Sequence, residues 1–406
     1  MLKRPDYMTA RALLMDAVEP VGTEWAALSE SGGRILAQDL IAVENVPPFD
    51  RSPYDGYALR AADTAGASGE TPVTLRVLEE VPAGSVPTEI VTEGFAVKIF
   101  TGAPIPQGAD AVINYERTSF TGTAVTVYAP LRSGENIIRA GEDVRCGGLL
   151  ARRGDAVDPG IAGTLASQGI AAPSVYQIPK VGILSTGSEL VEVNDVPGPG
   201  PGKIRNSNRH TFEALLKAIG CEGVYLGTAG DSAAEICGLI REGLRKCSAI
   251  VITGGVSAGD YDLTPDAMEM AGVELLFRGV AIKPGMACAY GVWGGKPVCG
   301  LSGSPASALT NFYAIGLPAL RKLMGCREPL PRNVKVTLSG SFGKKSPVTR
   351  FLRGKLELKD GRVCMALPGN QGNAVLSSVI GCDVMAVVPA GSGPLPSGTE
   401  LEGFLL

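Results

Sequence analysis

The chain has 406 residues, of which 45% are hydrophobic and 19% charged, and its formal net charge is −4. This composition supports packed cores and excludes an intrinsically disordered chain, and the length predicts about two to four domains. The acidic balance, without a strongly basic segment, argues against a nucleic-acid-binding protein. No apolar run approaches the roughly 18–20 residues of a membrane span, and the opening MLKRPDYMTARALLMDAVEP carries acids and a proline where a signal peptide is apolar. We therefore expect a cytoplasmic protein that binds neither nucleic acid nor membrane.

The counts of cysteine and histidine restrict the chemistry. Nine cysteines contain no C-x-x-C pair, which argues against a structural zinc site and favours small core residues or free thiols. The one histidine, His210, would have to serve any Ser-His-Asp triad, and it excludes a multi-histidine metal site. Catalysis would therefore rest on acids, lysines, arginines, hydroxyls and hard cations such as Mg²⁺.

The N-terminal third predicts one domain inserted into another. Thr9 has the character of an N-cap before apolar residues at helical spacing, and helical signals return at DPGIAGTLASQGI, where Asp158 and Pro159 begin a helix and Gly169 ends it. The stretch between them alternates like half-buried strands, for example in TPVTLRVLEEV. We predict a helical unit from residues 1–44 and 141–178, with a β-rich domain inserted at 45–140.

The remainder of the chain predicts two further domains. In residues 179–328 short apolar strands alternate with capped helices, which is typical of a doubly wound parallel sheet with helices on both faces. Ligands of such sheets bind beyond the carboxyl ends of the strands. In residues 329–406 strands recur at roughly ten-residue spacing without helices, which predicts a C-terminal β domain.

Three loops of small or hydroxylated residues follow strands of the expected sheet: TGSE at 186–189, GGVS at 254–257 and SGSP at 302–305. A lone Gly-Gly pair is most often ordinary turn chemistry. Three such loops at one sheet edge can surround a phosphate with N–H and O–H donors, and Glu189, Asp260 and Asp262 lie close enough in the chain to hold Mg²⁺. The set favours a phosphate or nucleotide site.

Several motifs carry a family resemblance in order along nearly the whole chain: FDRSPYDGYALRAADT, IFTGAPIPQGADAVI, ILSTGSEL, TGGVSAGDYD, IKPG and GLSGSPASAL. The sequence resembles the molybdopterin molybdenumtransferase family of the MoeA and gephyrin E-domain type. The resemblance implies a split N-terminal unit with an inserted β domain, a central domain like that of MoaB and MogA, a C-terminal β-barrel-like domain, and an elongated homodimer.

The same resemblance implies a function in molybdenum cofactor biosynthesis. Members take adenylylated molybdopterin and molybdate, use Mg²⁺ and release AMP, and other proteins of the pathway are expected partners. Two alternatives stay open: adenylylation of molybdopterin, against which the extra terminal domains argue, and a non-catalytic binding or scaffold role, against which the retained acids argue. Tungstate could replace molybdate.

Residue by residue, the resemblance implies six catalytic positions: Asp55, Thr101, Glu189, Asp231, Asp262 and Lys283. Among these, Glu189 and Asp262 would hold the metal, and Asp55 would serve the partner subunit's site. Each has a plainer interpretation too, since Asp55 and Thr101 suit turns, Asp231 suits a helix N-cap and Lys283 suits a solvated surface.

A further set would bind the substrate: Thr186, Gly187, Ser188, Asn206, Ser207, Asn208, Gly254, Gly255, Ser257, Gly303, Ser304, Ser307 and Arg353. The residues from Asn206 to Asn208 could equally cap a helix, and Arg353 would face the oxyanion. The sequence departs from the family pattern near that oxyanion: Met286 replaces a second lysine, Ser302 and Ser304 alter the third loop, and Asn373 replaces a serine. We expect weaker oxyanion binding or a preference for another oxyanion.

Overall fold

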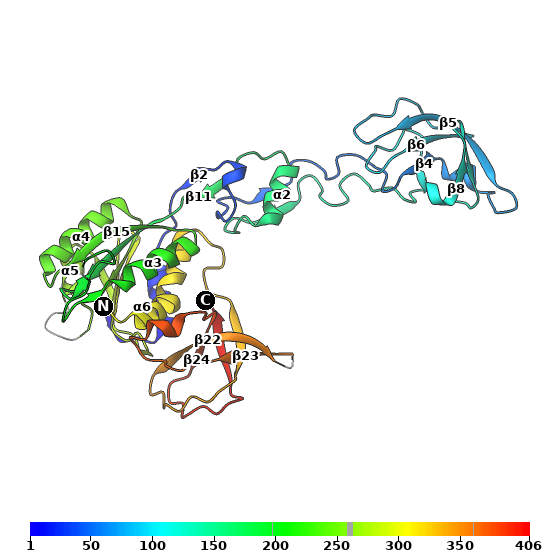
Figure 1. Ribbon diagram of the computed structural model, residues 1–406. Coiled ribbons are helices and arrows are strands. Elements are labelled where there is room, and N and C mark those ends of the chain that lie inside the picture. Colours follow the sequence, from blue (N-terminus) through cyan, green and yellow to red (C-terminus); the bar gives the residue numbers. More distant parts are fainter. Residues whose placement is uncertain (197, 258–262, 360) are drawn as a thin grey trace. The chain divides into compact units, whose positions relative to one another are not determined.

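A computed structural model describes residues 1–196, 198–257, 263–359 and 361–406. The chain forms two compact units (Figure 1). Unit 1 comprises residues 1–38, 153–159 and 172–406, and unit 2 comprises residues 39–152 and 160–171. The chain of unit 1 is thus interrupted by unit 2, and our finer division into four domains stays a prediction.

Unit 1 is built on a seven-stranded sheet. Its strands are, in spatial order, β1 (Leu2–Lys3), β17 (Glu274–Arg278), β19 (Cys288–Trp293), β20 (Lys296–Leu301), β16 (Ala249–Thr253), β12 (Lys180–Thr186) and β15 (Glu222–Ala229). The four strands from β20 to β15 are mutually parallel, as predicted. Their carboxyl ends therefore meet at one edge.

One strand of this sheet runs against the expectation of a parallel sheet. β19 is antiparallel to both of its neighbours, β17 and β20. The cause is the connection between β19 and β20, a two-residue turn of Gly294 and Gly295 with φ of 55° and 79°. Two consecutive positive φ values match the tight turns that join antiparallel strands, so this pair forms a hairpin instead of a helical crossover.

Helices cover both faces of the sheet, as the alternation of strands and helices predicted. One face packs against α4 (Ala233–Lys246) and α5 (Thr264–Met270), and the other against α1 (Tyr7–Asp16), α3 (Ser207–Ala218), α6 (Pro305–Asn311) and α7 (Leu317–Leu323), the last two joined by the π-helix Phe312–Gly316. Successive strand residues serve opposite faces: Ile183 packs with the second set and Leu184 with the first.

The start of α1 corrects one sequence prediction. Its N-cap is Asp6 and not Thr9, because the Asp6 carboxylate accepts from the backbone N–H groups of Met8 and Thr9, each at 3.0 Å. The hydroxyl of Thr9 donates to the same carboxylate at 2.6 Å. Thr9 therefore lies in the first turn and adds to the cap that Asp6 provides.

The C-terminal region of unit 1 is a closed five-stranded barrel, as the β-barrel-like expectation required. Its strands are β21 (Asn333–Leu338), β22 (Thr349–Lys359), β23 (Arg362–Ala366), β24 (Val384–Val388) and β25 (Glu400–Leu405), and β22 pairs with β24 to close the ring. The short strand β18 (Ile282–Lys283) pairs in parallel with β22. A segment of the central chain is thereby attached to the barrel. The 3-10 helix η5 (Leu376–Val379) follows in the same region.

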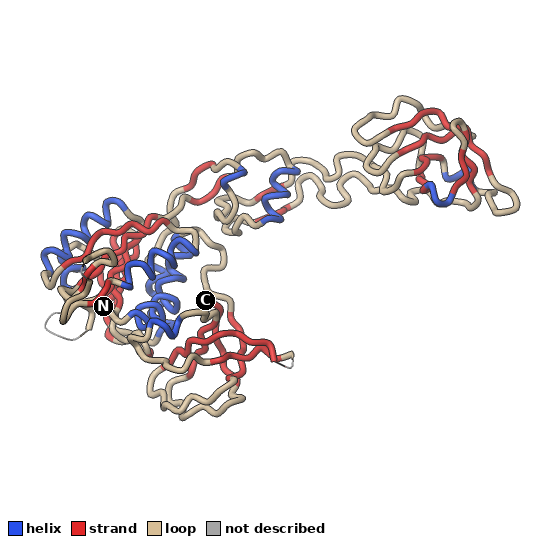
Figure 2. The backbone as a smooth tube through the Cα atoms, in the orientation of Figure 1, coloured by secondary structure: helices blue, strands red, loops and turns tan. Residues whose placement is uncertain are grey.

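Unit 2 contains a six-stranded sheet with the order β7 (Ala111–Asn114), β4 (Gly56–Leu59), β6 (Phe95–Ile99), β5 (Val73–Val81), β9 (Ala124–Val127) and β8 (Thr118–Phe120). Strands and loops dominate residues 39–152 in Figure 2. The pair β3 (Leu40–Ile41) and β10 (Leu149–Ala151) also belongs to it. The helix α2 (Pro159–Ser167) begins at the predicted proline.

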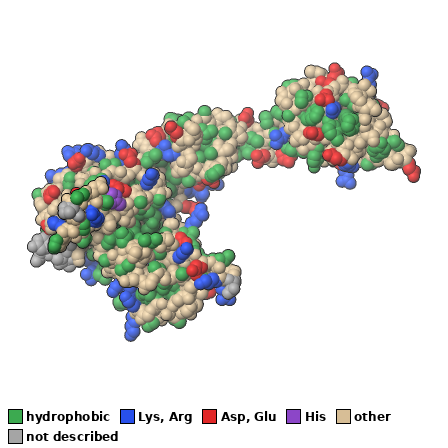
Figure 3. Space-filling model, in the orientation of Figure 1, with side chains coloured by type: hydrophobic (Ala, Val, Ile, Leu, Met, Phe, Trp, Pro, Cys, Tyr) green, Lys and Arg blue, Asp and Glu red, His purple; other side chains and the backbone are tan. Residues whose placement is uncertain are grey.

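Two further pairs of short strands lie outside these sheets. β2 (Thr23–Trp25) pairs with β11 (Ser174–Tyr176), and β13 (Leu190–Val191) pairs in parallel with β14 (Ile204–Arg205). Three single 3-10 turns complete the set: η1 (Leu28–Glu30), η2 (Ala61–Thr64) and η3 (Tyr115–Arg117). Within the described ranges, no helix is long and apolar enough to cross a bilayer. In Figure 3 basic and acidic side chains are mixed over the face in view.

Candidate functional site

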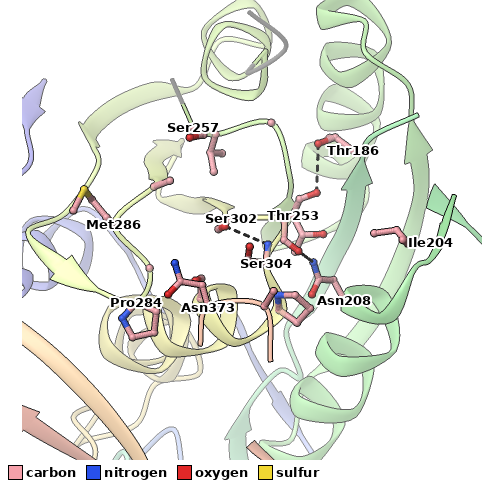
Figure 4. Close-up of a pocket in the computed structure, with 18 of the residues that line it drawn as sticks. Thr186, Ile204, Asn208, Thr253, Ser257, Pro284, Met286, Ser302, Ser304 and Asn373 are labelled. Carbon is pink, nitrogen blue, oxygen red and sulfur yellow. Dashed lines mark hydrogen bonds between the residues drawn. The ribbon is translucent and has the colours of Figure 1, made fainter. Parts of the chain in front are cut away.

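The three small-residue loops meet at the carboxyl edge of the sheet. They follow β12, β16 and β20, which are adjacent parallel strands. Together they line a cavity of about 730 Å³, here called the edge cavity (Figure 4). The first loop contributes Thr186 and Glu189, the second Gly255 and Ser257, and the third Ser302, Gly303 and Ser304. The predicted convergence of the three loops at one edge of the parallel strands is present.

Glycine is required where the second loop crosses the first. Gly254 and Gly255 have φ of 104° and 63°, and a Cβ on Gly254 would run into the carbonyl oxygen of Thr186. The loops are also hydrogen-bonded to one another: Thr186 Oγ1 donates to the Thr253 carbonyl at 3.4 Å, and Gly254 N donates to the Leu301 carbonyl at 2.9 Å. The loop backbones therefore hold one another close to the cavity without intervening side chains.

The opposite wall comes from β18 and the barrel. The segment that starts at Ile282 supplies Lys283 and Met286, and a barrel loop supplies Asn373 and Ala374. This loop contacts the start of α6, since Ser307 N donates to the Asn373 carbonyl at 3.2 Å. Among the described lining residues, Glu189 and Lys283 are the charged ones. The cavity therefore presents a cation and a carboxylate amid hydroxyls, amides and backbone.

Of the two predicted metal ligands, Glu189 lines the edge cavity. The Glu189 carboxylate lies against Gly187, where a Cβ would collide with it. Asp262 and its neighbour Asp260 lie outside the described residues. In the part of the chain that the structure describes, no three acids, cysteines or histidines gather into a metal-binding group. The Mg²⁺ site stays a prediction.

Three predicted substrate-binding residues lie at the start of helix α3, and they differ in what they contact. Asn206 is its N-cap and accepts from Arg209 N at 3.2 Å, and Ser207 is its first residue. Only the third, Asn208, lines the edge cavity, where its Nδ2 donates to the Gly303 carbonyl at 2.9 Å. Its Oδ1 is buried without a hydrogen-bond partner in the structure.

Asp231 does not line the edge cavity. It does not cap α4 either, because the N-cap is Ser232, whose Oγ accepts from Glu235 N at 3.4 Å. Of the other predicted residues in these loops, Gly187, Ser188 and Gly254 lie beside the cavity lining without belonging to it, whereas Ser307 belongs to it.

Arg353 lies behind the barrel loop and is only 1% exposed. Its guanidinium donates through Nε to Ser378 Oγ at 3.2 Å and through Nη2 to the Gly372 carbonyl at 3.3 Å. The side-chain amide of Gln371 accepts a hydrogen bond from Arg353 N at 3.1 Å and donates one to the Arg353 carbonyl at 2.8 Å. Nη1 is buried without a partner, and burial lowers the pKa of the guanidinium. Arg353 therefore supports the loop that carries Asn373 and does not itself line the edge cavity.

In unit 2 the structure joins two predicted residues that are 46 positions apart in the chain. Asp55 Oδ1 accepts from Thr101 N at 2.8 Å and from Thr101 Oγ1 at 2.7 Å. These two bonds lower the pKa of Asp55, although both residues are exposed. Asp55 directly precedes β4 and Thr101 follows β6, so neighbouring strands place them together.

Some lining residues escaped the sequence analysis. Leu190 and Ile204 belong to the β13–β14 pair, whose two-residue strands give no periodic pattern. Thr253 also lines the edge cavity and is 2% exposed. A usable signal existed for it: a hydroxyl residue ends the apolar strand AIVIT directly before the two glycines.

Comparison with protein families gives three matches in chain order. The MoeA N-terminal region (domain I and II) matches residues 6–169. A probable molybdopterin binding domain matches residues 182–322, and the MoeA C-terminal region (domain IV) matches residues 335–406. The loops of the edge cavity that follow β12, β16 and β20 all fall within the second range.

Similar whole proteins give the same result. A molybdopterin molybdenumtransferase of Staphylococcus aureus strain Mu50 is 36% identical over 380 residues, which cover 93% of this chain and 90% of that protein. The chain belongs to the molybdopterin molybdenumtransferase family. Another molybdopterin molybdenumtransferase, from Staphylococcus epidermidis strain RP62A, is 34% identical over 378 residues, again 93% and 90% of the two chains. The crystal structure of the molybdopterin biosynthesis MoeA protein from Pyrococcus horikoshii OT3 superposes with a TM-score of 0.86 at 33% identity, covering 99% of this chain and 100% of that chain. The predicted family and fold class are confirmed.

Proposed function

We propose that the edge cavity is the site at which this chain inserts molybdenum into molybdopterin. Membership of the molybdopterin molybdenumtransferase family makes the chain an enzyme of molybdenum cofactor biosynthesis that performs this insertion. The observation that supports the location is the convergence of three strand-exit loops, rich in hydroxyl and backbone donors, on one cavity large enough for a nucleotide-sized ligand.

The charges around the edge cavity suit an anion. Lys283 lines it directly. Arg353 adds a buried positive charge behind the loop of Asn373, and its guanidinium donates to a hydroxyl and a carbonyl, without an ion pair to a described carboxylate. A buried cation without a counter-ion is costly, and an anion bound nearby would lower that cost. In the proposed arrangement, Lys283 contacts the oxyanion and Arg353 contributes through the barrel loop.

The donors at the other end of the cavity suit a phosphate linkage. Ser257, Ser302 and Ser304 offer hydroxyls, and Gly255 and Gly303 line the same cavity without a side chain that could keep a phosphate away from the loop backbone. The proposed substrate is adenylylated molybdopterin, and cleavage of its pyrophosphate bond by water releases AMP. These donors hold the phosphates in line without a covalent intermediate on the protein.

Mg²⁺ prefers carboxylate oxygens as ligands, and the Glu189 carboxylate lies at the cavity wall. Asp262 is predicted to lie beside it. When bound there, Mg²⁺ would offset phosphate charge. Glu189 and Asp262 would hold it, while Thr186 and Ser257 keep the neighbouring wall polar.

The exposed Asp55–Thr101 pair of unit 2 is the proposed contribution to the partner subunit's site in a homodimer. An exposed carboxylate that is kept charged by two hydrogen bonds can meet a ligand or a cation presented by another surface. The working location is the cytoplasm, where other proteins of molybdenum cofactor biosynthesis would supply the substrate and receive the product. Tungstate is the proposed alternative oxyanion.

The experiment that tests this function mixes the purified protein with adenylylated molybdopterin, Mg²⁺ and molybdate and follows the products by mass spectrometry. Molybdenum-loaded molybdopterin together with AMP is the expected result. Consumption of ATP to make the adenylylated substrate would instead indicate the adenylyltransferase reaction. Ligand binding without turnover would indicate a non-catalytic protein.

A further inference from the structure

The wall of the edge cavity opposite Lys283 includes a small paired element. β13 and β14 form a parallel pair, and Leu190 and Ile204 from this pair line the cavity together with Glu189, the residue directly before β13. Its backbone is tied by Ile204 N to the Glu189 carbonyl and by Asn206 N to the Val191 carbonyl, each at 2.9 Å. Two residues per strand bury little surface, so the position of this wall depends on what anchors it.

The anchor is the carboxylate of Glu192, the residue directly after β13. Its Oε1 accepts from Tyr225 OH at 2.8 Å and from Asn206 Nδ2 at 3.2 Å, and its Oε2 accepts from Arg209 Nη1 at 2.9 Å. The hydroxyl of Thr228 adds a longer bond at 3.4 Å. These donors come from β15, from α3 and from the N-cap of α3. One side chain therefore connects the cavity wall to two large elements.

The donors are themselves held in place. The Arg209 guanidinium lies over the Tyr225 ring, 3.8 Å from its centroid, and its Nε also donates to Glu213 at 2.9 Å. The side chains of Glu192 and Arg209 are 32% and 27% exposed, so the pair is partly shielded from solvent. Burial raises the pKa of Glu192, but the bonds from Tyr225, Asn206 and Arg209 outweigh it and hold that pKa below its usual value. The anchor stays charged at neutral pH.

We propose that Glu192 is a positioning residue of the insertion site. It fixes the β13–β14 pair against α3 and β15, and through that pair it sets the place of Glu189 in the edge cavity. The inference rests on the proposed function, because it needs the edge cavity to be the site. Glu192 itself does not line the cavity and touches no reacting group.

The test compares Glu192→Ala and Glu192→Gln with a matched control, Glu213→Gln. The control removes the charge of another carboxylate that pairs with Arg209, and among the described contacts Glu213 has no bond to the β13–β14 pair. We expect Glu192→Ala to raise the KM for adenylylated molybdopterin and the Mg²⁺ concentration for half-maximal rate about tenfold, the usual range for residues that orient a ligand. At saturation kcat should stay within about twofold, since binding energy restores the displaced wall.

The amide variant should recover part of the loss, because its carbonyl can still accept from Tyr225 while the charge pairing with Arg209 is gone. A purely structural defect would lower the active fraction, and hence kcat, without changing KM. Hydrogen exchange gives a readout independent of activity: the amides of Ile204 and Asn206 should exchange faster in Glu192→Ala and unchanged in Glu213→Gln.

Unchanged KM and unchanged exchange in Glu192→Ala would overturn the inference. Its failure is distinguishable from failure of the proposed function by Lys283→Ala, measured alongside. Suppose that Lys283→Ala raises the molybdate concentration needed for half-maximal loading while the Glu192 variants behave like wild type. The location of the site is then supported and the role of Glu192 is wrong. If Lys283→Ala turns over normally, the location of the site is wrong.

Discussion

The edge cavity of unit 1 and the Asp55–Thr101 pair of unit 2 are built in opposite ways. Residues between Thr186 and Ala374 in the chain line the cavity, which lies between a sheet edge and a barrel and has a volume of about 730 Å³. The pair in unit 2 consists of two exposed side chains at the ends of neighbouring strands. In the proposed function, the cavity of unit 1 holds the ligand, whereas the pair in unit 2 meets a ligand that another surface presents. The first is then a proposed binding site and the second a proposed contact made to one.

The largest effect is expected from the removal of an acid on the cavity side. Asp262→Asn is expected to lower AMP release by about 100-fold or more, because it deletes one charge of the predicted metal ligands. The thermal midpoint should stay nearly constant. Product quantification and a melting curve on the same preparation test both parts, and normal turnover would remove Asp262 from the site.

Subunit mixing tests whether Asp55 serves the cavity of its own chain or that of the partner subunit. The Asp55→Ala and Lys283→Ala variants should each lose most of their AMP-release activity as homodimers. If Asp55 serves the partner's cavity, random mixing of equal amounts restores about a quarter of wild-type activity, since half of the dimers carry one intact site out of two. If both residues serve the same chain, mixing restores nothing. A fully active monomer in sedimentation at micromolar concentration would also contradict a shared site.

A smaller effect is expected at the cavity wall. Met286 is 37% exposed and lines the edge cavity together with Lys283, at the position where the family resemblance implies a second lysine. Met286→Lys should lower the molybdate concentration for half-maximal loading about tenfold, which corresponds to about 1.4 kcal/mol for one new charge-assisted contact. Loading curves with molybdate and with tungstate measure the change. Curves that stay where they are would show that position 286 does not face the oxyanion.

The smallest expected effect is a pH shift in unit 2. Thr101→Val deletes the Oγ1 bond to Asp55 but keeps the backbone bond. Both bonds lower the pKa of Asp55, so the variant's pKa should rise toward its ordinary value. The charged form, present above the pKa, is then lost at a higher pH, and the acid limb of the activity profile should move upward. A carboxyl NMR titration of Asp55 that shows no rise would argue against this coupling.

The parts of the fold that follow local rules were accessible from the sequence. Strand exits with glycines predicted the edge cavity, because parallel strands put their carboxyl ends together. The hairpin of Gly294 and Gly295 also has a local signal, yet the surrounding rhythm of strands and helices suggested a crossover instead. The N-cap of α1 is Asp6 and not the predicted Thr9, because a carboxylate with two oxygens can accept from several first-turn donors at once.

Long-range placement was not accessible. The burial of Arg353 depends on a loop some twenty residues away closing over it, and sequence spacing cannot show whether an arginine on a strand faces solvent, a cavity or the interior. The joining of Asp55 and Thr101 depends on a strand order that local patterns leave open. The anchoring of Glu192 draws on β15 and α3, so it exists only in the folded chain.

The most direct test of the central claim is anomalous diffraction at the molybdenum edge from crystals of the full-length protein soaked in molybdate. We expect one strong peak in the edge cavity beside Met286 and Asn373, placed so that an oxygen of the molybdate accepts a hydrogen bond from Lys283 Nζ, and we expect its loss in crystals of Lys283→Ala. A peak on unit 2, or on unit 1 away from the edge cavity, would contradict the assignment of the insertion site.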